Sequence, residues 1–236
     1  MSYAVLVLEQ PWWNISVDPG QTSVRHFLDG LARLDELSIF HATFFDTSSF
    51  DLALLHLLDA RKLEDIERVI VYVSSHGSGG RIGNGHGPSM NLSTVFDRIQ
   101  QHGKGKVAGL ILDSCEVGGE FETIKSGMRK ARICWTLGYQ ASVDWLSSTL
   151  INLHVLSVMS RLELANLRDR NELLLGVQLA LELFNPFQII AADKNDEDNI
   201  TFLSEALTVM IRLPRTNPEL LLAEEIWPEL EEEEED

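Results

Sequence analysis

The sequence predicts an α/β fold in three layers, with a central, mostly parallel six-stranded sheet and helices on both of its faces. Short apolar runs rich in β-branched residues alternate with segments whose apolar residues recur at helical spacing. Such alternation is typical of parallel strands joined by helical crossovers, which are buried on both faces. The 236 residues, 44% of them apolar, suit one domain with a sizeable core.

The elements follow from these patterns in chain order. Six apolar runs predict strands, at residues 3–9, 38–45, 68–73, 106–112, 131–138 and 186–193. Apolar residues at helical spacing predict helices, at residues 22–37, 48–62, 92–102, 145–167 and 171–184. The segment Ile200–Leu213 fits either a helix or a strand. We expect one domain at 1–213 and an acidic tail at 214–236. The like charges of the tail repel one another, so we expect it to be disordered or to bind a partner.

Charge and cysteine content exclude several classes of function. A net charge of −17 repels nucleic-acid phosphates and anionic membranes, so we expect neither as a partner. No apolar run is long enough for a membrane span, and the first residues lack the basic start of a signal peptide. Two cysteines, Cys115 and Cys134, make no disulfide framework and predict a reducing, cytoplasmic location. Cys134 falls within a predicted strand and is interpreted as an inert core thiol.

The stretch "VSSHGSGGRIGNGHG" follows the third predicted strand and has several interpretations. It contains neither the P-loop pattern nor a G-x-G-x-x-G that opens a helix, so phosphate binding is weakly supported. His76 and His86 have no zinc-ligand spacing and no Cys, Asp or Glu between them, so we expect no metal and no cofactor. A flexible loop with a structural histidine is the simplest alternative.

A second stretch, "LILDSCEVGG", favours a catalytic role for His76. His76 and Cys115 each come directly after a short apolar strand, and ligands bind beyond the carboxyl ends of strands in open α/β sheets. If the two strands are neighbours, the side chains meet there as a nucleophile and its base. Gly77 lets a substrate carbonyl approach the backbone, where its N–H is a candidate oxyanion donor. His86 and His102 are alternative bases, and Ser78–Gly87 is expected to be a mobile loop at the rim.

These motifs resemble those of the caspase-like cysteine peptidases, which include caspases, metacaspases, separase-type enzymes and the CHAT peptidases of bacteria. "IVYVSSHGSGG" resembles the family's His-Gly motif, and "GLILDSCEVGG" resembles its Cys motif in a form nearest to CHAT domains. "ICWTLGYQASVDWLSSTLINL" is similar to the CHAT segment that follows the nucleophile. The resemblance covers roughly residues 3–160 and implies a three-layer caspase-like sandwich. The caspase signature Q-A-C-[RQG]-G is absent.

The resemblance also implies a specificity pocket. In this family, the residue two positions before the nucleophile lines the pocket for the P1 side chain, and an aspartate there accompanies a basic P1 residue. Asp113 holds that position, and a carboxylate facing Arg or Lys gains a charge-assisted contact. The alternative is that Asp113 only hydrogen-bonds the backbone of its turn. Asp18 and Asp144 are weaker candidates for pocket charge, Asp144 being equally suited to capping a helix. Trp12 is expected at the rim, to stack on substrate or pack over the sheet edge.

We therefore expect a cysteine endopeptidase that cleaves after Arg or Lys with a Cys115/His76 dyad. The resemblance implies latency until a regulatory protein partner or signal activates the enzyme, and a role in bacterial defence or programmed death. The basic segment 121–132 would then offer self-cleavage sites in a processing loop, or be a solvated loop or short helix instead. One alternative is a catalytically silent caspase-like module that binds a basic partner. Another is a different thiol-dependent acyl hydrolase on the same kind of sheet.

Overall fold

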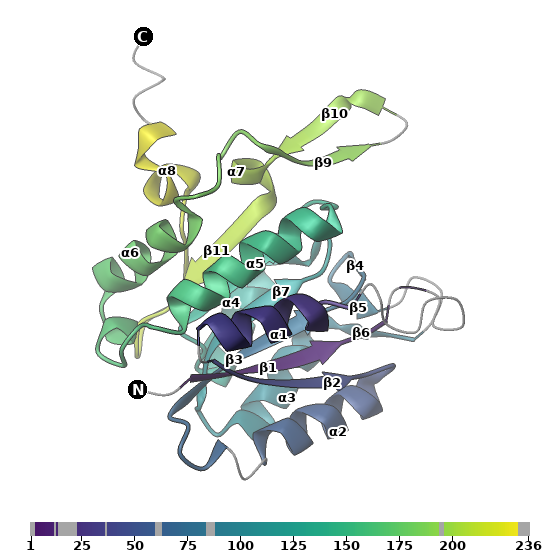
Figure 1. Cartoon of the computed structure of the whole chain (residues 1–236), viewed down its shortest axis with the longest axis vertical. Helices are drawn as coiled ribbons and strands as arrows, with labels where there is room; N and C mark the ends of the chain where they lie inside the picture. Colours follow the sequence, from purple (N-terminus) through teal and green to yellow (C-terminus); the bar gives the residue numbers. More distant parts are fainter. Residues whose placement is uncertain are drawn as a thin grey trace.

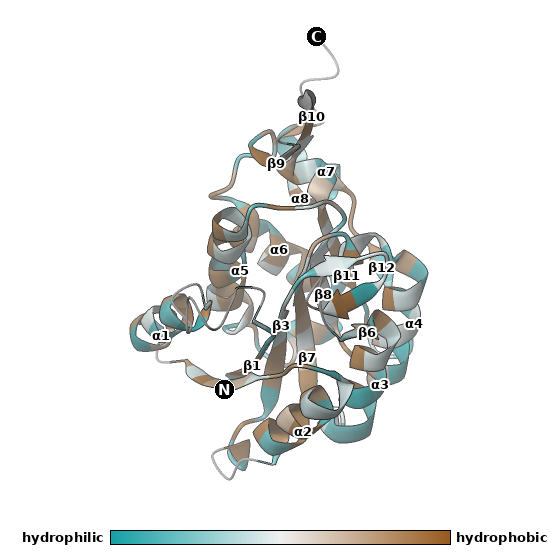
Figure 2. Ribbon diagram, turned by 90° about the vertical axis from the view of Figure 1, so that its right-hand side faces the viewer, coloured by the Kyte–Doolittle hydropathy of each residue, from teal (hydrophilic) through white to brown (hydrophobic). Residues whose placement is uncertain are grey.

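A seven-stranded sheet runs between two layers of helices in the structure, which is a computed structural model (Figures 1 and 2). Residues 3–11, 13, 23–35, 37–59, 63–83, 88–193 and 196–230 are described, with the backbone alone for 191–193 and 196–199. The strands, in their order across the sheet, are β12 (Glu219–Leu220), β11 (Leu207–Ile211), β8 (Trp135–Tyr139), β7 (Val107–Asp113), β3 (Arg68–Ser74), β1 (Tyr3–Glu9) and β2 (Ser38–Thr43). The five strands from β8 to β2 are parallel, and β11 and β12 are antiparallel additions at one edge.

Each face of the sheet has its own helical layer and its own hydrophobic core (Figure 2). One layer consists of α1 (Arg25–Leu34), α5 (Trp145–Met159) and α6 (Arg170–Leu181). The other layer consists of α2 (Thr47–Leu58), α3 (Leu92–Gly103) and α4 (Phe121–Ala131). Successive residues of β1 alternate between the two cores, as the two-residue period of a strand requires. None of the helices in the described part of the chain is long and apolar enough to cross a membrane.

The strand register aligns the carboxyl ends of three neighbouring strands. Ser74 at the end of β3 is paired with Glu9 of β1 on one side and with Asp113 of β7 on the other. The loops that follow these strands therefore leave the sheet at one edge. That edge lies beside the small sheet of β4 (Gly77–Ser78), β5 (Arg81–Gly83) and β6 (Ser89–Asn91) in Figure 1.

The first five predicted strands lie in the central sheet, but the sixth does not. The run predicted at 186–193 forms β9 (Ile189–Asp193), which pairs with β10 (Asp196–Phe202) in a separate two-stranded sheet. This hairpin extends away from the central sheet (Figure 1). The segment 200–213 holds both alternatives, because it contains the short helix α7 (Leu203–Ala206) and then β11. The central sheet therefore has seven strands and not six, because β11 and β12 take the place of the predicted sixth strand. An apolar run identifies a strand but not its partner.

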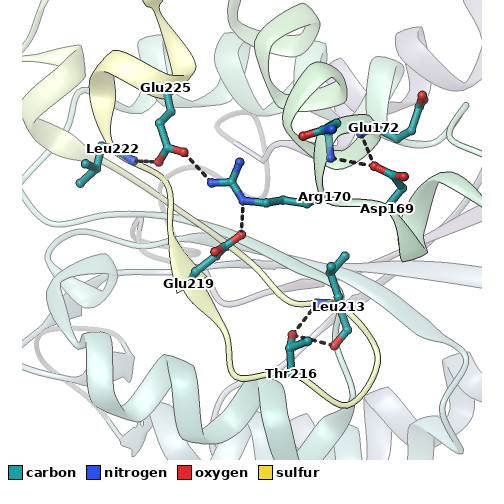
Figure 3. A network of polar contacts seen from close by, with 9 residues as sticks. Asp169, Arg170, Glu172, Leu213, Thr216, Glu219, Leu222 and Glu225 are labelled. Atoms are coloured by element: carbon teal, nitrogen blue, oxygen red, sulfur yellow. Dashed lines mark hydrogen bonds and ion pairs between the residues drawn. The ribbon is translucent and has the colours of Figure 1, made fainter.

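The described residues after 213 pack against the domain, which differs from the predicted division at that point. Beyond β12 lies the short helix α8 (Ala223–Ile226), and Leu221, Ile226 and Trp227 are buried in one of the two cores. Arg170 of α6 fastens this segment from outside (Figure 3). Its guanidinium is 2.7 Å from a carboxylate oxygen of Glu219 and 2.5 Å from one of Glu225. The last six residues, 231–236, lie outside the described part of the chain.

The basic segment 121–132 is helical and not a processing loop. It forms α4, which is packed so closely on α3 that a Cβ on Gly127 would lie 2.2 Å from the ring of Phe96. Arg132 ends the helix in the left-handed conformation. Cleavage between Lys125 and Arg132 would therefore require this helix to open.

Candidate active site

Two neighbouring strands bring the candidate nucleophile and base to the same edge of the sheet. Ser74 and Asp113 are register partners at the ends of β3 and β7, and the backbone N–H of Ser75 donates to the carbonyl of Asp113 at 3.1 Å. His76 and Cys115 each follow two residues after this matched pair. The sequence suggested that the loops after β3 and β7 lie side by side. They do so because the two parallel strands pair in register.

Contacts between the two loops continue beyond the strands. The hydroxyl oxygens of Ser75 and Ser114 are 3.1 Å apart, and the Ser78 hydroxyl donates to the Glu116 carboxylate at 2.9 Å. Between these contacts, a Cβ on Gly77 would lie 2.3 Å from the carbonyl oxygen of Cys115. Only glycine allows an approach this close. The loop after β3 is therefore held directly against the backbone of Cys115.

A cavity of about 200 Å³ opens between these loops and the start of α5. Its lining combines the candidate base, thiol and carboxylate with polar and aromatic neighbours: Ser74, Ser75, His76, Asp113, Ser114, Cys115, Val143, Trp145 and Ser148. Three of the residues singled out from the sequence thus share one cavity. Its position beyond the carboxyl ends of the strands is the usual one for ligand sites in open α/β sheets.

The hairpin after His76 leaves the N–H of Gly77 outside the hydrogen-bond ladder to β5. Ser78 and Arg81 flank a two-residue turn at Gly79 and Gly80, both of which have positive φ, as this kind of turn requires. Hydrogen-bonded and non-hydrogen-bonded pairs alternate along an antiparallel ladder. Since Gly83 donates to His76 at 2.9 Å, the intervening pair of Gly77 and Ile82 is a non-hydrogen-bonded one. The Gly77 N–H then points away from β5, as an oxyanion donor must.

The same hairpin corrects the expectation of a mobile loop at the rim. Residues 77–83 form β4 and β5, and 89–91 form β6, so the rim consists largely of a small antiparallel sheet. The Gly-Gly pair was the sequence signal for this turn. Residues 84–87, which include His86, lie outside the described part of the chain.

The environment of Cys115 disfavours a free thiolate. Burial raises the pKa of the Cys115 thiol, a hydrogen bond from the Val143 backbone acts in the opposite direction, and the negative charges of Asp113 and Glu116 raise the pKa further. A thiol of this kind needs a base to take its proton before it can attack. Glu116 has φ 64°, a left-handed conformation that is uncommon outside glycine and is often found at functional sites. This bend turns the chain sharply after Cys115.

Asp113 is a buried carboxylate held by three donors. Its Oδ2 accepts from the Tyr72 hydroxyl at 2.7 Å and from the Ser74 hydroxyl at 3.0 Å. Its Oδ1 accepts from the Asn152 amide at 3.0 Å. Burial raises the pKa of Asp113, while the hydrogen bonds from Tyr72 and Ser74 lower it. Among the described residues, no Arg or Lys lines the cavity with it.

Sequence reasoning missed the residues that hold Asp113. Tyr72 and Ser74 lie two apart on β3 and therefore point to the same face of the sheet. Ser148 and Asn152 are buried polar residues four apart on α5, so they share one face of that helix. Two polar residues at helical spacing within an apolar helix were a usable signal. Their partner could not be named, because no pattern in the sequence shows which strand the helix covers.

Of the remaining sequence candidates, Asp144 is described, and it does not line this cavity. Asp144 is exposed and caps α5, accepting from the backbone N–H of Ser147 at 2.9 Å, and it is not among the lining residues although Val143 and Trp145 are. Its capping role was the alternative weighed from the sequence. Trp12 and Asp18 lie outside the described part of the chain. In the described ranges, no group of three or more His, Cys, Asp or Glu side chains is placed to hold a metal ion.

A buried carboxylate at the end of β1 lies along the same edge of the sheet. Glu9 accepts from the Val24 backbone N–H at 2.9 Å and lies 2.8 Å from Nε2 of His41 on β2. The hydroxyl of Ser23 donates to it as well. These contacts fix the start of α1 to the edge at which the cavity opens. Glu9 was not singled out from the sequence because it ends an otherwise apolar strand.

Comparison with solved structures identifies the fold. A secreted C11 cysteine protease of Bacteroides thetaiotaomicron, solved with an irreversible peptide inhibitor, superposes with a TM-score of 0.54 at 11% identity. The superposition covers 89% of this chain and 66% of that one, so this chain spans about two thirds of that protease's length. Caspase-1 of Spodoptera frugiperda superposes with a TM-score of 0.52 at 11% identity, over 89% of its own length and 94% of this chain. A scan against protein-family models and a search of curated proteins find no match.

These likenesses establish the fold of the chain, which is the caspase-like fold of cysteine peptidases. They confirm the caspase-like fold class that the sequence predicted. At 11% identity they say nothing about individual site residues.

Proposed function

We propose that the chain is a cysteine endopeptidase that cleaves peptide bonds after Arg or Lys. One observation carries this proposal: a single cavity at the carboxyl edge of a caspase-like sheet contains His76, Cys115 and the buried carboxylate of Asp113. A nucleophile, a base and a charged specificity group are the minimum set for such a reaction.

In the proposed reaction, His76 takes the proton of the Cys115 thiol as the sulfur attacks the scissile carbonyl carbon. The carbonyl oxygen becomes an oxyanion that accepts a hydrogen bond from the Gly77 N–H, and the N–H of Cys115 is a second candidate donor. The imidazolium then gives its proton to the leaving amine, and the peptide bond breaks. Water hydrolyses the resulting thioester with His76 as base, which restores the thiol.

The preference for a basic P1 residue follows from the charge of Asp113. A buried carboxylate that no Arg or Lys accompanies gains a charge-assisted hydrogen bond when a guanidinium or ammonium group enters. Its three protein donors fix its orientation and occupy part of its acceptor capacity, since an ionised carboxylate has about four acceptor sites. Asp113 is therefore proposed to face the substrate and not only to brace its own turn.

Latency is part of the proposal. The cavity of about 200 Å³ is small beside the roughly 300–1,000 Å³ of ordinary ligand pockets, and burial raises the pKa of the Cys115 thiol. We propose that a protein partner or signal widens the site, in the cytoplasm and in a defence or programmed-death system. This last step rests on the resemblance to CHAT peptidases alone.

A positional peptide library tests the proposal with the full chain, alone and with the products of neighbouring genes. We expect cleavage after Arg and Lys and none after Asp, and we expect Cys115→Ala to abolish it. Cys134→Ala provides the matched control and should cleave at the wild-type rate. Activity that persists in Cys115→Ala, or a preference for acidic P1 residues, would refute the mechanism. Cleavage of esters but not of peptides would favour a different acyl hydrolase.

A further inference from the structure

A second, larger cavity lies at the amino edge of the sheet, at the opposite ends of the same strands. Its volume is about 710 Å³, and it opens where β3 and β7 begin, beside the end of α4 and the turn after β11. Six arginines line it: Arg68, Arg129, Arg132, Arg168, Arg212 and Arg215. The whole sequence has 19 Lys and Arg residues against 36 Asp and Glu, so this concentration of positive charge opposes the charge of the chain.

These arginines are not neutralised within the described part of the chain. No Asp or Glu lines the cavity there, and the ion pairs found among the described residues involve other basic residues. Arg129 hydrogen-bonds the amide oxygen of Asn217 at 3.5 Å, and Arg68 the carbonyl of its own neighbour. Both contacts are with neutral groups. Six like charges that converge without carboxylates repel one another, which lowers the stability of the fold unless an anion binds.

The arginines are arranged from the floor of the cavity to its mouth. Arg212 is only 8% exposed, and it donates from Nε to the carbonyl of Ile133 at 3.0 Å and from Nη1 to that of Leu213 at 3.3 Å. Arg68 is half-buried, and the other four are exposed at the rim. The positive charges of Arg212, Arg68 and Arg168 act together on the Cys134 thiol, whose pKa burial raises and these charges lower. Both backbone bonds of Arg212 leave further N–H donors on its guanidinium.

Two of the rim arginines occupy backbone positions where glycine is favoured. Arg132 has φ 60° at the end of α4, and Arg215 has φ 69° in the turn after β11. Thr216 fastens that turn, since its hydroxyl donates to the Leu213 carbonyl at 3.1 Å and accepts from the Leu213 N–H at 3.2 Å (Figure 3). At both positions an arginine adopts a left-handed backbone conformation that costs free energy for any residue other than glycine. Such a cost is expected where the side chain has a task.

We propose that this amino-edge cavity binds a compact organic polyphosphate, such as a nucleoside triphosphate or an inositol polyphosphate. Guanidinium groups pair with phosphate oxygens in a bidentate manner, and each phosphate group carries up to two negative charges. A cluster of phosphates therefore brings more negative charge into a small volume than the same number of carboxylates, which carry one charge each. Val107, Ala108, Leu164 and Leu167 in the lining offer an apolar surface to the rest of the ligand.

A small ligand fits better than a nucleic acid. The cavity is a local positive site on a chain of net charge −17, and that field repels an extended polyanion. A compact polyanion enters the cavity without lying along the negative surface. The proposal goes beyond the peptidase reaction, and its test needs no peptidase activity.

Isothermal titration calorimetry on the full chain at low salt tests this site with three probes: sodium triphosphate, ATP and inositol hexakisphosphate. We expect at least one to bind, to weaken as salt rises, and to raise the melting temperature by about 5 °C or more at saturation. Triphosphate alone reports the phosphate contacts, ATP adds a base, and inositol hexakisphosphate adds charge density. The comparison among them separates the two sources of phosphate.

Paired variants locate the binding. Arg132→Gln with Arg215→Gln removes two rim charges without disturbing the buried Arg212, and we expect the dissociation constant to rise at least about tenfold. Arg25→Gln with Arg33→Gln removes the same charge from α1 and should change it less than about twofold, a loss of charge alone having little effect at a distance. Circular dichroism verifies that both double variants fold. The proposal is overturned if none of the probes binds at millimolar concentration, if both double variants weaken binding equally, or if duplex DNA binds as tightly as the probes.

Discussion

The two ends of β3 and β7 carry opposite charge, and the contrast explains what each end can bind. At the carboxyl edge, a cavity of about 200 Å³ holds the buried carboxylate of Asp113 and no Arg or Lys among the described residues. At the amino edge, a cavity of about 710 Å³ holds six arginines and, within the described ranges, no acidic residue. A seven-residue strand separates the two by roughly 20 Å.

Within the described part of the chain, neither cavity lines its charged side chains with the opposite charge: Asp113 has no Arg or Lys there, and the six arginines have no Asp or Glu. Such charge lowers the stability of the fold and is retained where a ligand of opposite charge binds. Buried apolar strands lie between the two cavities and carry no charged side chains in their interior. Each cavity can therefore bind a ligand of its own charge preference. A basic P1 side chain is proposed for one end and an organic polyphosphate for the other.

The largest effect is expected from removing the charge of the carboxyl edge. Asp113→Asn should lower kcat/KM for an Arg-P1 peptide by at least about 30-fold, since losing one partner of a buried charge pair costs about 2 kcal/mol or more. The measurement is steady-state cleavage of matched peptides with Arg or norleucine at P1, and the ratio between them should fall. Asp144→Asn, at the exposed helix cap, should leave the ratio unchanged. An undiminished preference for Arg in Asp113→Asn would remove Asp113 from the pocket.

The next effect comes from the tight approach of the two carboxyl-edge loops. Gly77→Ala places a Cβ against the carbonyl oxygen of Cys115, so we expect a loss of about 1–3 kcal/mol in the free energy of unfolding and at least about tenfold lower activity. Urea denaturation and peptide cleavage measure the two effects. A Cβ on Gly30 in α1 would meet nothing within 4 Å, and Gly30→Ala should be neutral or stabilising by up to about 1 kcal/mol. Equal behaviour of the two variants would show that the loops are not held together.

A smaller effect is expected from the acidic neighbours of the thiol. Because its pKa is raised, Cys115 should react with iodoacetamide faster as the pH rises, with a midpoint above the ordinary thiol value. Glu116→Gln removes one of the negative charges that raise this pKa, so the midpoint should move to lower pH by a few tenths of a unit. Glu122→Gln, exposed on α4, should not move it. A midpoint already below neutral pH in the unmodified chain would mean that the thiolate is stabilised at rest.

The last prediction concerns the segment that supports the amino edge. Arg170→Gln removes the ion pairs that fasten β12 and α8, and half-exposed pairs of this kind contribute about 1 kcal/mol in total. The melting temperature should fall by about 2–4 °C. Differential scanning calorimetry measures it, and Arg25→Gln, which affects only an exposed pair on α1, should lower it less. No change in Arg170→Gln would indicate that burial of Trp227 alone holds the segment.

Sequence patterns predicted the parts of this structure that depend on local chemistry. Apolar runs located the strands, helical spacing located the helices, and the parallel arrangement placed His76 and Cys115 at one edge. What they could not predict depends on partners distant in sequence. β9 reads as a core strand but pairs with β10. The segment after 213 was predicted to be an acidic tail, but Leu221, Ile226 and Trp227 anchor its described part.

The same limit applies to the two cavities. Asp113 was visible from its place before the thiol, but Tyr72 and Asn152, which hold it, come from a strand and a helix that only the fold brings together. The six arginines of the amino edge are scattered between residues 68 and 215, and their spacing in sequence carries no signal. A single sequence does not show which of its distant residues the fold brings together.

Site-mapped labelling tests the central claim most directly. The full chain is treated with an acyloxymethyl ketone that carries Arg at P1, and peptide mass spectrometry locates the adduct. Since the thiol of Cys115 lies beside His76 and Asp113 in the proposed pocket, the account predicts a single adduct on Cys115 that is lost in His76→Ala and outcompeted by an Arg-P1 peptide. An adduct on Cys134 instead, or equal labelling by an Asp-P1 ketone, would contradict it.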